Sequence, residues 1–164
     1  MFIAIYFYDV VLALHIAAIV LAFGVTFAYP ILGPVVRNLQ PNAVPTFHRA
    51  QAAIGNRLIA PAGGVALLAG IYLASDRDYF SKIWVQVPMV ILVLLLAMGG
   101  AFFSPTERKL AELAERDVAA GDGSKVTWSP EYEALHRRWQ VAATIGPLLV
   151  LVAIFFMAAK PGGY

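Results

Sequence analysis

The stretch Tyr8-Asp-Val-Val-Leu-Ala-Leu-His-Ile-Ala-Ala-Ile-Val-Leu-Ala-Phe-Gly-Val-Thr-Phe-Ala-Tyr29 is long and apolar enough to cross a lipid bilayer. A helix rises about 1.5 Å per residue, so about 20 apolar residues cross a hydrocarbon layer about 30 Å thick. The stretch carries an imidazole, His15, within its apolar run. It therefore predicts a membrane-spanning helix with an ionisable group at depth.

Three more segments have the same apolar character. We expect the spans at residues 8–29, 54–74, 83–103 and 139–159. The first residues lack the basic flank of a signal peptide, so we expect the first span to remain in the mature protein. The fold class predicted for the single domain 1–164 is all-α, an antiparallel four-helix transmembrane bundle with a short amphipathic cytoplasmic helix.

The composition also separates the chain from soluble proteins. Hydrophobic residues make up 60% and charged residues 13% of the 164 residues, and the mean hydropathy is +0.74. Soluble proteins average about 25% charged residues. The basic residues lie mainly between apolar segments, which disfavours nucleic-acid binding. Cysteine is absent, so a metal or cofactor must use His, Met, Tyr or carboxylate ligands.

One face of the first span is expected to turn toward the other helices. Residues three, four and seven positions from His15 share its face of a helix. Small residues allow helices to approach closely, and a buried imidazole needs a hydrogen-bond partner. Gly63, Ala66 and Gly70 form a second small-residue seam, in span two. The residues expected to face the bundle from span one are Tyr8, Val11, Leu12, His15, Ala18, Ala22, Thr26 and Tyr29.

The connections between spans differ in their predicted structure. Residues 32–46 contain three prolines and predict an ordered connector without regular structure, whereas residues 75–82 predict a tight turn. Ser104-Pro-Thr-Glu107 matches a capping box, so a new helix is expected over residues 105–120. Its apolar positions recur at helical spacing, which is typical of an amphipathic helix lying on the membrane surface. Ser129-Pro130 predicts the start of a helix that continues to the end of the last span.

The distribution of basic residues predicts the orientation in the membrane. Nine of the 12 Lys and Arg residues lie on the side of the first and third loops, and Arg77, Lys82 and Lys160 lie on the other side. Cytoplasmic loops keep the excess of positive charge. We therefore expect a multi-pass protein of the bacterial cytoplasmic (inner) membrane with both termini outside.

His15 is the leading candidate for a functional residue, and three roles remain open for it. It is a structural hydrogen-bonding residue, a ligand of a cofactor or metal, or a proton-relay group. Imidazole coordinates heme iron and copper, and Met is an axial ligand in some hemes. The cofactor-binding candidates are therefore His15 and Met89, which is expected at a similar depth, and the metal-binding candidate is His15. Heme b and copper are the candidate groups.

The other two histidines, His48 and His136, are expected at the cytoplasmic surface, where lipid headgroups would be their neighbours. That position is too far from His15 for a shared mononuclear site. The sequence shows no Gly-rich phosphate loop, no HExxH motif and no paired carboxylates within a span. Hydrolases and nucleotide-driven enzymes are disfavoured, no catalytic residue is predicted, and we expect a protein that is not an enzyme.

Several short segments resemble a family of predicted bacterial four-helix integral membrane proteins of unknown function. They are Leu14-His15-Ile16 with Phe23-Gly24, Pro61-Ala-Gly, Leu68-Ala-Gly-Ile-Tyr-Leu73, Pro105-Thr-Glu-Arg and Phe156-Met-Ala-Ala-Lys-Pro-Gly162. The first-helix His followed by Phe-Gly is also remotely similar to copper-resistance D type and HemJ-type membrane proteins. That resemblance implies heme or metal chemistry at His15 alone. The lysine that HemJ-type enzymes use in a later span is missing from the spans here.

Three functions follow from these observations. The first is a membrane protein that binds heme or copper through His15. The second is an accessory or assembly subunit that packs its small-residue seams against a larger membrane complex or a second copy. The third is a small transporter, which is disfavoured because no inverted repeat and no charged residues along a path are visible.

Overall fold

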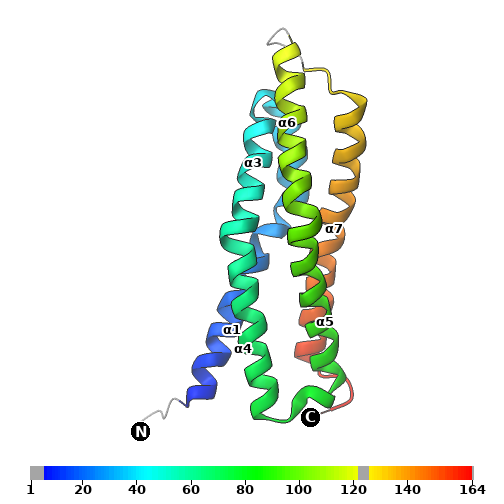
Figure 1. The fold of residues 1–164 in the computed structure, drawn as a ribbon. Coiled ribbons are helices and arrows are strands. Elements are labelled where there is room, and N and C mark those ends of the chain that lie inside the picture. The colour runs from blue at the N-terminus through cyan, green and yellow to red at the C-terminus, as the bar shows by residue number, and fades with distance from the viewer. Residues whose placement is uncertain (1–5, 122–125, 164) are drawn as a thin grey trace.

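A computed structural model describes residues 6–121 and 126–163, and these residues form long helical rods that run side by side (Figure 1). Four rods are long and apolar enough to cross a membrane: residues Phe7–Leu39, Pro41–Asp76, Ile83–Ala120 and Pro130–Ala159. Both termini and the connection between the second and third rods lie at the same end of the molecule (Figure 1). The predicted all-α, antiparallel four-helix bundle is confirmed.

Each rod is longer than a bilayer needs. The second rod has 36 residues, which corresponds to about 54 Å of helix, against about 30 Å of hydrocarbon. In each rod, the predicted span covers the part that lies toward the end of the molecule with both chain termini. The remaining helical turns extend beyond the predicted spans. The bundle therefore has two halves, and the second half holds the loops that were expected to be cytoplasmic.

The first rod contains a short 3-10 turn but continues as a helix past Pro30 and Pro34. Helix α1 (Phe7–Phe23) passes through the short 3-10 turn η1 (Gly24–Phe27) into α2 (Tyr29–Leu39). Pro30 occupies the first turn of α2, where its missing N–H is not needed. The 3-10 turn η2 (Pro41–Ala43) and helix α3 (Val44–Ile54) follow. The prediction that residues 32–46 lack regular structure is therefore wrong.

The second and third rods each contain one π-helical turn ahead of a proline. Turn η3 (Gly55–Ile59) joins α3 to α4 (Ala60–Asp76), and turn η5 (Gly99–Phe103) joins α5 (Ile83–Met98) to α6 (Ser104–Ala120). A proline leaves the carbonyl four residues before it without its usual donor. For Pro61 and Pro105 these carbonyls belong to Arg57 and Ala101, and both lie inside the π turns. Local widening of the helix accommodates each proline without ending the rod.

Helix α6 is the main departure from the expected fold. Its first residues do not form a capping box, because Phe103 before it is already helical and no side chain caps it. Span three and residues 105–120 are therefore one rod. Leu110, Ala111, Leu113 and Ala114 are buried against neighbouring helices, and α3 and α6 lie side by side (Figure 1). The prediction of a helix on the membrane surface is wrong, since protein covers its apolar face.

The remaining connections agree with the prediction. Residues 77–82 form a tight turn that contains the 3-10 turn η4 (Tyr79–Ser81) and one left-handed residue, Asp78. Helix α7 (Pro130–Ala159) begins after Ser129, whose hydroxyl accepts a hydrogen bond from the Tyr132 N–H at 3.3 Å. It continues without a break to Ala159.

Candidate functional site

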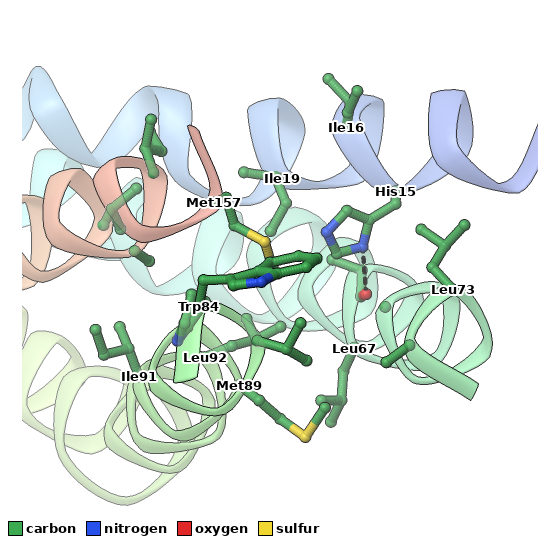
Figure 2. A pocket seen from close by; sticks show the side chains of 18 of the residues that line it. His15, Ile16, Ile19, Leu67, Leu73, Trp84, Met89, Ile91, Leu92 and Met157 are labelled. Carbon is green, nitrogen blue, oxygen red and sulfur yellow. Dashed lines mark hydrogen bonds between the residues drawn. The ribbon is translucent and has the colours of Figure 1, made fainter. Parts of the chain in front are cut away.

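His15 lies where the prediction placed it, on the face of α1 that turns inward. Ala18, Ala22 and Tyr29 on the same face are buried, and His15 itself is partly buried. Its Nδ1 lies 2.7 Å from the carbonyl oxygen of Ala66 on α4 (Figure 2). A carbonyl oxygen only accepts, so Nδ1 carries the hydrogen and donates it. In the neutral imidazole, Nε2 then holds the free lone pair.

Small residues on α4 make room for this imidazole. A Cβ added to Gly70 would lie 3.0 Å from Cε1 of His15 and 3.4 Å from its Nδ1. Ala66, one turn earlier, is fully buried. Within the chain, Ala66 and Gly70 of the predicted seam therefore pack against α1, whereas Gly63 lies against Leu96 of α5. Contact of this protein with a larger complex stays a prediction.

The imidazole borders a cavity of about 610 Å³ between α1, α4, α5 and α7. The cavity wall is mostly aliphatic and aromatic, with Tyr8, Tyr79, Trp84 and Lys160 among the polar exceptions. The Trp84 indole donates a hydrogen bond to the Gly163 carbonyl at 3.0 Å, and the Lys160 ammonium lies 5.1 Å from the centre of a Trp84 ring. These contacts hold the indole in the wall. An apolar cavity lined by few polar groups is typical of a binding site for an apolar ligand.

Met89 lines the same cavity as His15, as its predicted depth requires. In Figure 2 the Met89 sulfur points away from the imidazole, whereas the Met157 sulfur lies beside the Trp84 indole on the imidazole side. The structure thus places a second thioether near the site that the sequence had not singled out. Among the described residues, no group of three or more His, Asp or Glu side chains is arranged for a metal ion. The role of His15 and Met89 as ligands stays a prediction.

His48 and His136 do not lie among lipid headgroups. Both are buried, with 2% and 6% of their surface exposed. They belong to a group that we call the polar core, which extends from the ends of the predicted spans into the half of the bundle beyond them. The polar core consists of Tyr29, His48, Gln51, Glu107, Tyr132, His136 and Trp139. The prediction that the two histidines are interfacial is wrong because both side chains are buried inside the bundle.

Hydrogen bonds and ring stacking order the polar core. His48 contacts the Gln51 Oε1 atom through Nδ1 at 2.9 Å and the Tyr132 hydroxyl through Nε2 at 3.1 Å. Since Oε1 only accepts, Nδ1 donates to it, and in the neutral ring Nε2 accepts from the hydroxyl. The rings of Tyr132, His136 and Trp139 stack in sequence along α7, with centroids 5.4 and 5.8 Å apart. This arrangement suits an uncharged His48.

Burial shifts the ionisation of these groups. Burial lowers the pKa of His48 to about 4, although the hydrogen bond that His48 donates to Gln51 opposes the shift, and nearby His136 lowers the pKa further. Burial, with Arg37 nearby, also lowers the pKa of His136. Burial raises the pKa of Glu107 to about 7, although the hydrogen bond from Trp139 opposes the shift. Burial therefore favours the uncharged form of each of these three side chains.

Glu107 was missed as a candidate residue although its spacing carries a signal. It precedes Leu110, Ala111 and Ala114 by three, four and seven positions, which places it on the apolar face of its helix. The same spacing relates Tyr132, His136, Trp139 and Ala143 on α7. The charged residues around these positions indicate a solvated end of the protein, so the spacing alone does not predict that Glu107 is buried.

Comparisons with known proteins give a limited result. No protein-family model matches the chain, and no solved structure matches it. The lysophospholipid transporter LplT of Cronobacter sakazakii (strain ATCC BAA-894) is 32% identical over 105 residues, which are 57% of this chain and 26% of that protein. The chain thus spans about a quarter of the length of the curated relative that it matches. Together with the four membrane-spanning rods, this similarity shows a polytopic membrane protein.

Proposed function

We propose that the protein binds an apolar ligand inside the membrane, in the cavity beside His15, and that it is not an enzyme. The hydrogen bond from Nδ1 to the Ala66 carbonyl is the observation that carries this proposal. It selects one tautomer and orients the ring, as the second-shell bonds of ligand-binding histidines do. The apolar wall would bury the body of the ligand, and Nε2 would supply the polar contact.

Heme b is the first ligand to test. Its iron accepts an imidazole nitrogen and its macrocycle is apolar, and a bound heme supplies electron transfer. His15 would hold the iron, and Met89 and Met157 would line the wall around the macrocycle or supply a second ligand. The remote similarity to copper-resistance D type and HemJ-type proteins supports the same residue. Copper alone is the alternative, because imidazole and thioether are both copper ligands.

The experiment is purification in mild detergent after growth with a heme precursor and copper. We expect a Soret absorption band that disappears in His15→Ala and persists in Met89→Leu if Met89 only lines the wall. Metal analysis of the same samples tests copper. Colourless, metal-free protein whose organic extract holds no stoichiometric lipid would overturn the proposal of a ligand in this cavity.

A transporter of an amphipathic lipid is the second candidate function. The similarity to a lysophospholipid transporter favours it, over 57% of this chain. The cavity of about 610 Å³ is large enough for part of an acyl chain. Stoichiometric lysophospholipid in the extract, and transfer of labelled lysophospholipid across liposomes that contain the protein, would support this candidate. Protein-free liposomes give the background rate.

We also propose the bacterial cytoplasmic membrane as the location, with both termini outside. The basic residues support this orientation, because three lie at the end that holds the termini and nine belong to the other side. The chain has no cysteine, so single cysteines can be introduced on a native background. Labelling of intact cells with an impermeant thiol reagent should reach Asp78→Cys and spare Asn42→Cys. The reverse pattern would reject this orientation.

Any partner subunit or second copy would contact surfaces other than the α1–α4 seam, which is filled within the chain. Stoichiometric co-purification of another membrane protein would favour the accessory-subunit function. Loss of that partner on substitution of an exposed residue such as Leu14 or Leu68 would locate the contact. A monodisperse monomer in several detergents would speak against it.

A further inference from the structure

The segment Pro105-Thr-Glu-Arg has no role in the cavity, which lies in the other half of the bundle. Its glutamate, Glu107, is 4% exposed on α6. The carboxylate oxygen Oε1 accepts a hydrogen bond from Nε1 of Trp139 on α7 at 3.2 Å. Among the described residues, no ion pair includes Glu107. A single neutral donor is poor compensation for a buried negative charge.

The groups around Glu107 do not supply a positive charge. Tyr29 of α2 contributes a buried hydroxyl that has no hydrogen-bond partner in the described part of the chain. His48 of α3 is held in its neutral form by its two hydrogen bonds, and His136 of α7 is buried beside it. The basic side chains on the elements packed against α6, and next to Glu107 on α6 itself, are exposed: Arg49, Arg57, Arg108, Lys109, Arg137 and Arg138.

A half-buried cation in this half, Arg37, is paired with other groups. Arg37 forms an ion pair with Glu133 and lies over the rings of Trp128 and Tyr132, 5.5 and 5.8 Å from their centres. A second buried carboxylate, Asp117, accepts hydrogen bonds from the backbone and hydroxyl of Ser129 at 2.8 Å and pairs with Arg116. The same helix thus holds one well-compensated carboxylate and one, Glu107, that has little compensation.

We propose that Glu107 is a proton-binding site, which holds its proton while α6 and α7 are packed and releases it when that contact opens. The protonated carboxyl keeps Oε1 as an acceptor for the Trp139 indole and gains an O–H donor. The site binds a proton and needs no other ligand. It is independent of the cavity, so its failure leaves the proposed function intact.

The ionisation of Glu107 supports the geometry. Burial raises its pKa to about 7, more than the Trp139 hydrogen bond lowers it. Relative to an ordinary glutamate, this corresponds to a proton held about 300-fold more tightly. Proton occupancy would therefore change across the neutral range, where cells regulate their internal pH.

Difference infrared spectroscopy of the full-length protein in nanodiscs tests the proposal directly. Between about pH 5.5 and pH 8.5 we expect a carboxyl C=O stretching band whose midpoint lies near 7. The band should vanish in Glu107→Gln and persist in Glu112→Gln, the matched control, because Glu112 is an exposed carboxylate on the same helix. A band that remains in Glu107→Gln, or a midpoint near the ordinary value for glutamate, would overturn the proposal.

A second variant guards against a folding defect in Glu107→Gln. Trp139→Phe removes the hydrogen bond that favours the carboxylate and keeps most of the aromatic packing, so the midpoint should move to higher pH. A downward or absent shift would show that the indole does not act on this carboxyl. In a Trp84→Phe, Trp128→Phe background, the emission of Trp139 should titrate with the same midpoint as the infrared band.

Discussion

Replacing Glu107 by glutamine should stabilise the protein more at alkaline than at acidic pH. The amide keeps the shape of the protonated carboxyl and still accepts the hydrogen bond from Trp139. It cannot ionise. The variant therefore stays in the state that the wild type holds only at low pH.

The expected size follows from the pKa of about 7 for Glu107, raised from 4.5 by burial. A folded-state pKa above the unfolded value means that the native state binds the proton more tightly, so its stability falls as pH rises from 4.5 to 7. The full effect is about 3 kcal/mol, and about 1 kcal/mol of it is already lost at pH 5. The advantage of Glu107→Gln should grow by about 2 to 3 kcal/mol between pH 5 and pH 8.

The comparison with wild type at each pH is essential because the histidines act in the opposite direction. Burial lowers the pKa of His48 to about 4, so protonation below its ordinary value of 6.5 destabilises the fold. This contribution rises with pH between 4 and 6.5, where that of Glu107 falls. The free energy of unfolding of the wild type should therefore depend little on pH in this range. The difference between Glu107→Gln and wild type at each pH cancels the contribution of the histidines.

The assay is reversible unfolding by sodium dodecyl sulfate in mixed micelles, followed by tryptophan emission at several pH values. Glu112→Gln, an exposed carboxylate on α6, is the control and should shift the free energy of unfolding by a constant, small amount. A Glu107→Gln advantage that is the same at pH 5 and pH 8 would refute the reasoning. So would an advantage that is largest in acid.

The same unfolding assay tests three further expectations. Gly70→Ala should lower the free energy of unfolding by about 1 to 3 kcal/mol, because the new Cβ would lie 3.0 Å from a carbon of the His15 imidazole. The control Gly64→Ala should be neutral or stabilising, because nothing lies within 4 Å of its Cβ. Equal effects of the two substitutions would contradict the packing of α4 on α1. Tyr132→Phe should cost about 1 to 3 kcal/mol, since it removes the hydroxyl that a buried imidazole nitrogen contacts at 3.1 Å; a neutral result would mean that this bond is not formed. Arg37→Ala should lower the free energy of unfolding more than Arg49→Ala, because Arg37 also covers two aromatic rings. Arg49 forms only an exposed ion pair, which is worth at most about 1 kcal/mol. The reverse order would show that the contact of Arg37 with the rings contributes little.

Local properties of the chain were enough to predict the four crossings, the tight turn at residues 75–82, the start of α7 and the inward direction of His15. Hydrophobic length, helix caps and helical spacing depend only on neighbours in the sequence. The partner of His15 was not predictable, because the Ala66 carbonyl lies 51 positions along the chain. Nor was the position of Met157, which comes to the cavity from the last helix.

The other half of the bundle depended on tertiary structure. The periodicity of residues 105–120 showed that one face is apolar, but a lipid surface and a neighbouring helix would satisfy that face equally. The hydrophobic runs end where charged residues begin, but the backbone hydrogen bonds of each helix continue through the charged residues. The helical rods are therefore longer than the predicted spans. Only the packing of α3, α6 and α7 determined that His48 and His136 are buried and that Glu107 has a single hydrogen bond within the described part of the chain. The composition of the sequence determines which apolar segments are buried away from water. The contacts between helices that are distant in the sequence determine which polar side chains are buried with those segments.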